Sequence, residues 1–293
     1  MIPSLPRPAW LRAATAAYVA AFLAFLFLPL VVVGVFAFND APYPAPPWRG
    51  FTLDWFLGSA ARGRTGLFGD AELLASIGTS CLVAAWVTLL SVLLGTCNAF
   101  LLERGRFPGR QTLSVVMLAP LVIPGVILGI SILAFASRIA EFAGDAFGLE
   151  LDFLRPGLPL VVLGQFSFIA TIATLTIGAR LRRFDRTLEE AALNLGASRA
   201  AVFRTILLPY LRPSLVGSAA IAFLMSFEDF NTTLMLVGAD PPLTVMMYGR
   251  MREGATPVLN AVSLFLMLAS ALLALTLIRR GSPPPKPAGD AAA

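Results

Sequence analysis

Six long runs of apolar residues, separated by short polar segments, set the pattern of this chain. They lie at about 14–38, 73–102, 111–137, 158–180, 214–237 and 257–278. A helix needs about 20 mostly apolar residues to cross a bilayer, and every run reaches that length. The pattern predicts an all-α integral membrane protein with six transmembrane helices. The first run is too long for a signal peptide and has no small-residue cleavage site behind a short apolar region, so we expect an anchor.

Composition narrows the classes of function. Hydrophobic residues make up 57% of the 293 positions and charged residues only 13%, about half of the roughly 25% that a soluble domain carries. So few charges exclude a water-soluble enzyme, a nucleic-acid-binding protein and a disordered chain. Histidine, the commonest metal ligand, is absent. Cys81 and Cys97 lie in apolar surroundings, where we expect them to pack. We therefore expect neither a metal site nor a cofactor.

The basic residues predict the orientation in the membrane, because Lys and Arg gather on the cytoplasmic side. With the N-terminus inside, the inner segments hold 15 of the 22 basic residues and the outer segments hold 7. Both termini are therefore predicted to be cytoplasmic. The last segment, 281–293, contains four prolines and many small residues, and we expect a disordered cytoplasmic tail.

A polar segment on the predicted inner side, RRFDRTLEEAALNLGASRAAVFRTILLPYLR at 182–212, indicates two short amphipathic helices. Thr187 and Glu190 are spaced as a capping box, Gly196 suits a left-handed turn, and Ser198 can cap the second helix. Pro209 is expected to mark the exit of that helix. Apolar stripes consist of Leu188, Ala191, Ala192 and Leu195 on the first helix, and of Val202, Phe203, Ile206 and Leu207 on the second. From the pattern alone, a helix pair resting on lipid headgroups is an alternative.

The same segment carries the sequence E-A-A-x3-G-x9-I-x-L-P in full. Its fixed positions are Glu190, Ala191, Ala192, Gly196, Ile206, Leu208 and Pro209. This motif resembles the EAA loop of permease subunits in bacterial ABC importers that depend on a binding protein. The resemblance implies that these residues form a coupling helix that docks on a separate ATPase subunit. Two alternatives stay open, namely that Glu190 only caps its helix and that Gly196 serves only the turn.

The resemblance covers about 70–280, the five-helix permease core of this family, with the first helix as an N-terminal addition. It divides the chain into 1–70, 71–280 and the tail 281–293. Within the family the chain is most similar to the spermidine/putrescine group, on the phrases FTLDWF at 51–56, SFEDF at 226–230 and PLTVMMYGRMREGATPVLNA at 242–261. Permeases for iron, thiamine, phosphonates or opines share similar phrases and give the alternative substrates.

What the resemblance implies is a multi-pass protein of the bacterial inner membrane that forms half of a translocation path. Its expected partners are ATPase subunits, a second and related permease subunit, and a periplasmic substrate-binding protein. The chain itself is not expected to be an enzyme, because its only lysine, Lys286, lies in the tail and a phosphate-binding P-loop needs a lysine. A secondary transporter and a membrane anchor without transport are alternatives from other classes, and both leave the motif without a purpose.

Polar residues inside the apolar runs are candidates for the substrate path. Carboxylates in hydrocarbon are costly and usually face a bundle interior or an aqueous path. Glu228 and Asp229, with Asn231 and Thr232, form a polar sector of the fifth run that can receive an organic cation. The alternative makes the two acids structural, bonded to the backbone of a locally opened helix.

The third run contains helix-disrupting residues, Pro120 and Pro124, and the spacing Gly125-x3-Gly129. Proline bends a helix, and two glycines one turn apart allow a second backbone to approach closely. Interrupted helices often mark a substrate path, with ordinary helix packing as the alternative. Gln165 and Ser167 are also polar at membrane depth, but their direction does not follow from the sequence.

Overall fold

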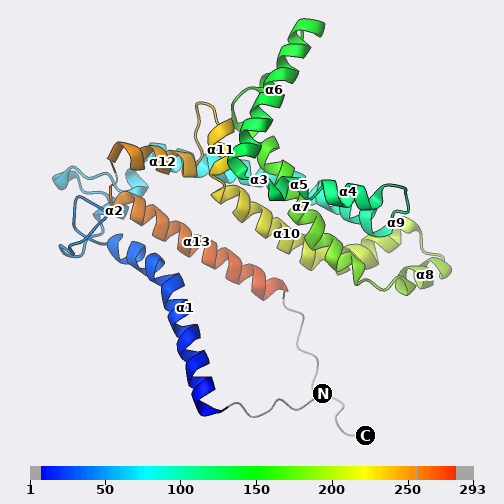
Figure 1. Cartoon of the computed structure of the whole chain (residues 1–293), viewed down its shortest axis with the longest axis horizontal. Helices are drawn as coiled ribbons and strands as arrows, with labels where there is room; N and C mark the ends of the chain where they lie inside the picture. The colour runs from blue at the N-terminus through cyan, green and yellow to red at the C-terminus, as the bar shows by residue number, and fades with distance from the viewer. Residues whose placement is uncertain (1–7, 255, 282–293) are drawn as a thin grey trace. The chain divides into compact units, whose positions relative to one another are not determined.

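A computed structural model of the chain describes residues 8–254 and 256–281, and it is built from helices (Figure 1). The α-helices are α1 (Ala9–Phe36), α2 (Asp54–Leu57), α3 (Ala71–Arg104), α4 (Arg110–Val116), α5 (Ala119–Val122), α6 (Gly125–Phe147), α7 (Leu158–Arg182), α8 (Thr187–Asn194), α9 (Arg199–Val202), α10 (Leu208–Glu228), α11 (Asn231–Leu236), α12 (Leu243–Gly254) and α13 (Val258–Gly281). Short 3-10 turns lie at Ala60–Arg62, Leu67–Gly69 and Asp152–Leu154, and a π turn lies at Phe203–Leu207.

The helices confirm the predicted all-α membrane fold. Among the described residues, five helices are long and apolar enough to cross a membrane: α1, α3, α6, α7 and the continuous segment Arg199–Glu228. Helix α13 occupies the sixth predicted run. The tail predicted for 281–293 lies outside the described residues from position 282 onward.

The third predicted helix, 111–137, is broken into α4, α5 and α6. Ile123 adopts an extended conformation with ψ 129°, directly before Pro124. A proline ring disfavours helical geometry in the residue before it, so α5 ends there and α6 begins at Gly125. Helix α6 then continues to Phe147, beyond the predicted end.

The fifth predicted helix, 214–237, is wrong at both ends. Its first residue is Leu208, and Pro209 does not end the preceding helix as expected, because the π turn leads directly into α10. A proline near the start of a helix costs little, since its missing N–H is one that lacks an intrahelical acceptor anyway. At the other end α10 stops at Glu228, Asp229 is extended with ψ 119°, and α11 begins at Asn231.

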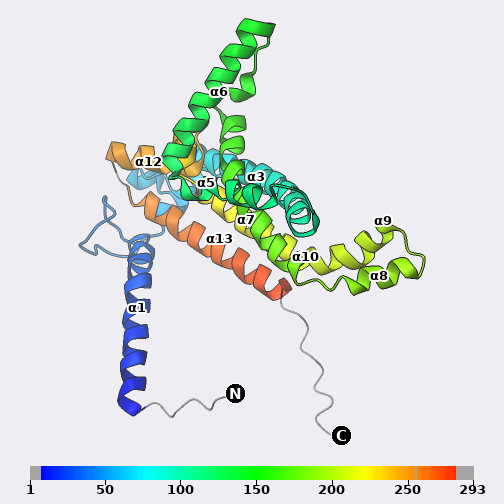
Figure 2. The same ribbon diagram turned by 45° about the vertical axis from the view of Figure 1, so that its right-hand side comes forward.

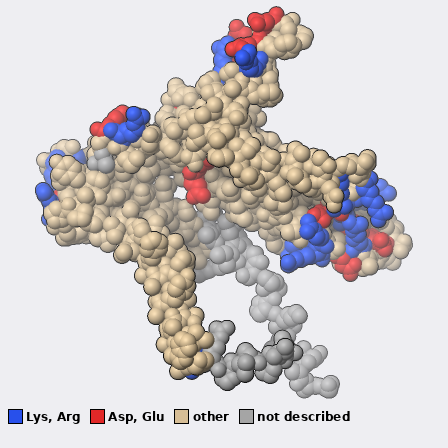
Figure 3. Space-filling view, viewed as in Figure 1, with Lys and Arg blue, Asp and Glu red and all other residues tan. Residues whose placement is uncertain are grey.

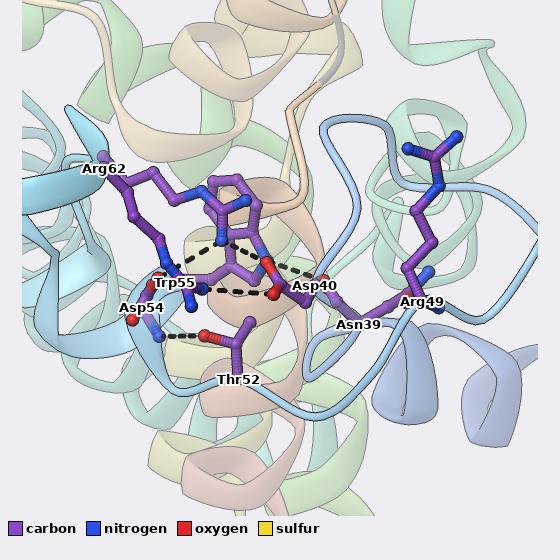
Figure 4. Close-up of polar contacts among 8 residues, drawn as sticks. Asn39, Asp40, Arg49, Thr52, Asp54, Trp55 and Arg62 are labelled. Atoms are coloured by element: carbon purple, nitrogen blue, oxygen red, sulfur yellow. Dashed lines mark hydrogen bonds and ion pairs between the residues drawn. The ribbon is translucent and has the colours of Figure 1, made fainter.

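The chain divides into two compact units, and the first contains residues 1–71 and 249–269. In the loop that follows α1, Asn39 is fully buried, and its amide side chain accepts from the N–H of Arg49 at 2.8 Å (Figure 4). The indole N–H of Trp55 donates to the carbonyl of Asn39 at 2.8 Å. Arg64 lies over the Trp55 ring at 4.6 Å and pairs with Asp40 at 2.5 Å. This loop is therefore folded by its own polar contacts.

The second unit contains residues 72–248 and 270–293. Helix α7 lies at its centre, because more than half of its apolar window is buried, and it packs against α10 and α11 (Figure 2). Side chains of α3, α6, α7, α10 and α11 share one apolar core, formed by Val83, Val87, Ala136, Leu160, Val161, Ile169, Ala222 and Leu236. Helices α8 and α9 lie at one end of this unit and α11 lies towards the other (Figures 1 and 2).

Candidate coupling and translocation sites

The interruption between α10 and α11 is stabilised by the carboxylate of Asp229. One carboxylate oxygen accepts from the N–H of Thr233 at 3.0 Å and from the Thr233 hydroxyl at 2.8 Å. A side chain that accepts from a backbone N–H in the first helical turn is a helix cap. The Thr244 hydroxyl of α12 donates to the carbonyl oxygen of Asp229 at 3.0 Å. Asp229 therefore bonds on both its side chain and its backbone, and it ties the start of α11 to α12.

A buried amide continues this hydrogen-bond chain into α7. Gln165 is 1% exposed, and its side-chain NH₂ donates to the Thr233 hydroxyl at 2.8 Å. Its side-chain oxygen accepts from the hydroxyl of Ser226. The hydrogen bonds therefore form a chain in which Ser226 donates to Gln165, Gln165 donates to Thr233, and Thr233 donates to Asp229. The direction of Gln165, which the sequence left open, is inward to the break; Ser167 instead donates to the carbonyl of Gly164 in its own helix.

Two glycines of α6 bring its backbone against α11. A Cβ atom added to Gly125 would lie 3.0 Å from the Asn231 Cβ, and one added to Gly129 would lie 2.9 Å from the Met235 Cβ. The second would also lie 3.2 Å from the carbonyl oxygen of Thr232. The close approach predicted from the Gly125-x3-Gly129 spacing is therefore confirmed, and it positions α11 beside the Pro124 break.

The four candidate path residues lie on different sides of the break. Glu228 and Asn231 are exposed, Asp229 is half-buried, and Thr232 is buried. Within the described ranges 8–254 and 256–281, Glu228 makes no hydrogen bond or ion pair. Figure 3 shows an acidic patch where α10 ends, on a face that is otherwise largely uncharged. The two neighbouring acids thus differ: hydrogen bonds fix the side chain of Asp229, whereas the side chain of Glu228 is exposed.

In the segment 182–212, α8 begins in a different way from the predicted capping box. Asp185, rather than Glu190, supplies the cap: its carboxylate accepts from the N–H of Thr187 at 3.0 Å and from the Thr187 hydroxyl at 2.8 Å. These bonds hold the pKa of Asp185 below its usual value. Asp185 forms the shorter local loop and takes the N–H of Thr187, one of the two backbone donors that the box would have used. The other, the N–H of Glu190, donates to the carbonyl of Arg186 at 3.2 Å. The side chain of Glu190 stays exposed, with no hydrogen bond to any residue the structure describes.

The predicted turn between the two helices is confirmed. Gly196 has a φ of +87°, in the left-handed region. Its N–H donates to the carbonyl of Leu193 at 3.0 Å, and the N–H of Ala197 donates to the carbonyl of Ala192 at 3.0 Å, which is the bond pattern of a Schellman cap. The hydroxyl of Ser198 then accepts from the N–H of Ala201 at 3.2 Å and caps α9 as predicted.

The first half of the motif forms an exposed surface, whereas part of the second half packs inside the chain. Leu195 is 89% exposed and Leu188 is 53% exposed; Glu190, Ala191 and Gly196 are exposed beside them, and Ala192 is half-buried. Ile206 instead packs against a cluster of Leu181, Phe184, Leu207 and Leu211. Leu208 and Pro209 are exposed. We call the surface formed by Leu188, Glu190, Ala191, Leu195 and Gly196 the hairpin face.

The C-terminal end of α3 holds the hairpin formed by α8 and α9, through residues that the sequence did not single out. Arg104 donates from both terminal nitrogens to the Glu189 carboxylate, one bond measuring 2.8 Å. Arg182 donates in the same bidentate way to Glu103, at 2.6 and 3.1 Å, and Arg186 donates to the Glu103 carbonyl at 3.1 Å. No sequence spacing connects pairs that lie 79 or 85 positions apart.

Comparison with known proteins defines the class. Residues 88–281 match the family described as "Binding-protein-dependent transport system inner membrane component". This match covers α7, the hairpin, α10 and α11, so the chain belongs to this family of importer permeases and is a multi-pass protein of the inner membrane. The resemblance drawn from the EAA motif is therefore confirmed.

Individual relatives agree with this membership. The chain is 29% identical to the "Putrescine transport system permease protein PotI" of Escherichia coli strain K12, over 83% of this chain and 82% of that protein. It is 27% identical to the "Spermidine/putrescine transport system permease protein PotC" of Haemophilus influenzae, over 86% and 91%. It is also 25% identical to the "Sulfate transport system permease protein CysT" of Salmonella typhimurium, over 71% and 76%.

Solved structures show the same fold. A chain of a bacterial ABC transporter that imports the acidic polysaccharide alginate aligns with a TM-score of 0.70 and 18% identity, over 93% of this chain and 95% of that one. A chain of the MetNI methionine ABC transporter, in an inward-facing conformation, aligns with a TM-score of 0.53 and 16% identity, over 71% and 92%.

Proposed function

We propose that this permease forms half of the translocation path of an ATP-driven polyamine importer and receives its energy from a separate ATPase subunit through the hairpin face. The observation that carries the coupling role is the exposure of Leu188 and Leu195 on a short helix whose other side is bonded to α3. Exposed apolar residues beside small ones suit a protein partner that covers them. The free Glu190 side chain supports contact with that partner, because Asp185 already caps the helix.

Co-purification tests the docking role. The wild-type chain, co-expressed with its cognate ATPase subunit and extracted in detergent, should retain the ATPase. Gly196→Trp should abolish that association and uptake, since a large side chain would occupy the face and strain a φ of +87°. Gly196→Asn tolerates the left-handed conformation and should retain most binding. Gly144→Trp, on α6 with no heavy atom within 4 Å of its Cβ position, is the size control and should leave binding unchanged.

An ATPase that binds Gly196→Trp as well as wild type would contradict the docking assignment. A chain that transports substrate without any ATPase would contradict the importer mechanism and favour a secondary transporter.

For the substrate, the names of the relatives and the local chemistry support the same class. PotI and PotC are named for putrescine and spermidine, which are organic cations. Glu228 presents an exposed carboxylate at a helix break, and this group can replace water around an ammonium ion. The sulfate relative allows a second class of cargo, but an exposed carboxylate in the path would repel a dianion. We therefore assign Glu228 to contact with the cation, with Asn231 exposed nearby, and Asp229 and Thr232 to the shape of the break.

Isosteric amides separate these roles. Glu228→Gln should leave assembly and the melting temperature close to wild type while putrescine uptake by the reconstituted complex falls at least tenfold. Asp229→Asn should lower the melting temperature, because it weakens the cap of α11, and should reduce uptake as a consequence. Normal putrescine uptake by Glu228→Gln, or a cognate receptor that binds no polyamine, would refute the polyamine assignment.

The remaining partners and the orientation belong to the same proposal. A periplasmic binding protein delivers the substrate, a second and related permease completes the path, and both termini face the cytoplasm. Single cysteines at Ala60 and Glu150 should then react with an impermeant reagent from the periplasm. Cysteines at Arg106 and Glu190 should react only from the cytoplasm, and the reverse pattern would overturn the topology.

A further inference from the structure

Helix α3 extends from the hairpin to the other half of the second unit. It contains 34 residues, which corresponds to about 51 Å at 1.5 Å per residue. It is adjacent to neither the hairpin nor the α10–α11 break in the sequence. Nevertheless, one end of α3 contacts the hairpin, and the other end contacts α12, which is bonded to the α10–α11 break.

At the inner end, Arg104 is fixed by more than its ion pair with Glu189. Its guanidinium lies 5.3 Å from the centre of the Phe100 ring and 5.9 Å from that of Phe184. The side chains of Arg104 and Glu189 are only 26% and 18% exposed. A bidentate pair with stacked aromatic neighbours has one favoured geometry, so α8 and the end of α3 are constrained to move together.

Towards the outer end, α3 is bonded to α12. The hydroxyl of Ser80 accepts from the N–H of Leu243 at 2.8 Å, and the hydroxyl of Ser76 donates to the sulfur of Met246 at 2.9 Å. All four residues are buried. Between Leu243 and Met246, the Thr244 hydroxyl donates to the carbonyl of Asp229. A continuous series of contacts therefore connects the hairpin, α3, α12 and the start of α11.

We propose that Arg104 is a positioning residue for energy coupling: its ion pair with Glu189 makes α3 follow the hairpin, and α12 transmits this movement to the break at Asp229. The proposal rests on the proposed function, because it takes the hairpin face as the ATPase docking site. The chain itself already connects the hairpin to the rest of the unit, because α7 leads into α8 and α10 follows α9. The contacts of α3 and α12 would add a second connection between the hairpin and the break. Spatial continuity alone does not establish coupling, so the pair must be tested by its energetic effect at the break.

The test uses the complete complex of permease subunits, ATPase and receptor in nanodiscs. The readout is the change in amide hydrogen exchange at 229–236 when ATP and vanadate trap the closed ATPase. The variants are Arg104→Glu, Glu189→Arg and the double charge swap. Arg106→Glu is the matched control, because Arg106 is exposed two positions away and makes no ion pair with a described residue.

Each single variant should bind the ATPase and hydrolyse ATP as wild type does, while the vanadate-induced change at 229–236 falls about tenfold, a typical size for coupling between sites. The charge swap should recover most of that change, and Arg106→Glu should not alter it. Wild-type responses in both single variants would overturn the proposal, and so would an assembled charge-swap variant without recovery. Failure of the wild-type chain to bind any ATPase would instead refute the proposed function, and the two failures are therefore distinguishable.

Discussion

Two discontinuities in the second unit, the α10–α11 break and the 183–186 turn between α7 and α8, are secured by different kinds of contact. At the turn, two bidentate ion pairs bind the end of α3 to the flanking helices: Glu103 pairs with Arg182 at the end of α7, and Arg104 pairs with Glu189 of α8. At the break, the contacts that the structure describes are hydrogen bonds among Ser226, Gln165, Thr233 and Asp229, together with glycine packing from α6.

The difference follows from the two environments. Water at the membrane surface reduces the desolvation penalty of a charge pair, whereas burial of two charges inside a helix bundle costs several kcal/mol per ion. The break therefore uses an amide and hydroxyls around a single acid. It follows that the stability of the break should depend on close packing and on its hydrogen bonds. The stability of the turn should depend on the charges of its side chains and therefore on pH.

The largest expected effect comes from the glycine packing. Gly129→Ala should destabilise the chain by about 1–3 kcal/mol, the usual cost of overpacking, because its Cβ would lie 2.9 Å from the Met235 Cβ. Gly144→Ala on the same helix has open space at its Cβ, so it should be neutral or slightly stabilising. Thermal unfolding of the detergent-purified permease measures both. Equal melting temperatures for the two variants would show that α6 does not constrain α11.

The next effect comes from the buried amide. Gln165→Leu leaves the Ser226 hydroxyl without its acceptor, and one unsatisfied buried group costs about 1–3 kcal/mol. The Asp229 cap remains, so the loss of stability should be smaller than that of Gly129→Ala. Ser167→Ala removes only a bond within α7 and should stay within about 0.5 kcal/mol of wild type. Thermal unfolding of the purified permease measures both variants. A Gln165→Leu variant with the stability of wild type would contradict a structural role for this hydrogen-bond network.

The same comparison explains what the sequence could predict. The Pro124 break and the close approach of α6 follow from local properties, since proline excludes the helix and two glycines one turn apart remove side-chain bulk. The Asp229 break follows from the sequence only as the alternative of a locally opened helix: the cap from Asp229 to Thr233 is local, but the bonds from Gln165 in α7 to Thr233 and from Thr244 in α12 to Asp229 are not. These partners become neighbours only once the bundle has formed.

Within the hairpin, two predictions were wrong because a neighbouring feature of the sequence competed with the predicted one. The spacing of Thr187 and Glu190 satisfies a capping box, but Asp185 reaches the N–H of Thr187 over only two residues. Pro209 has the residue type of a helix exit, but the π turn before it places the proline in the first turn of α10. The Gly196 turn and the Ser198 cap were correctly predicted, because no other nearby group competes for them.

Within the hairpin that follows the turn, loss of a single cap should have a moderate effect. Ser198→Ala removes the bond to the N–H of Ala201 and should cost about 1 kcal/mol, the typical value for a helix cap. Thr205→Ala, in the same hairpin, removes a hydroxyl that bonds only to the preceding helical turn and should be nearly neutral. Hydrogen exchange of α9 in the purified permease measures both, and equal protection in the two variants would show that the cap is not needed.

The smallest expected effect is the pH dependence of the ion pairs at the turn. The ion pair between Glu103 and Arg182 requires an ionised Glu103 carboxylate. Because an ordinary glutamate ionises at about pH 4.3, the contribution of this pair is present at neutral pH and is lost on strong acidification. The contribution should be below about 1 kcal/mol, since Arg182 is 72% exposed and screened by water. The melting temperature should therefore fall between pH 7 and strongly acidic pH, and it should fall less for Glu103→Gln. Glu190→Gln, which removes an exposed carboxylate on the same hairpin, should follow the wild-type curve. An identical acid response in Glu103→Gln and wild type would show that charge pairing does not secure the turn, and the contrast with the α10–α11 break would then lose its electrostatic basis.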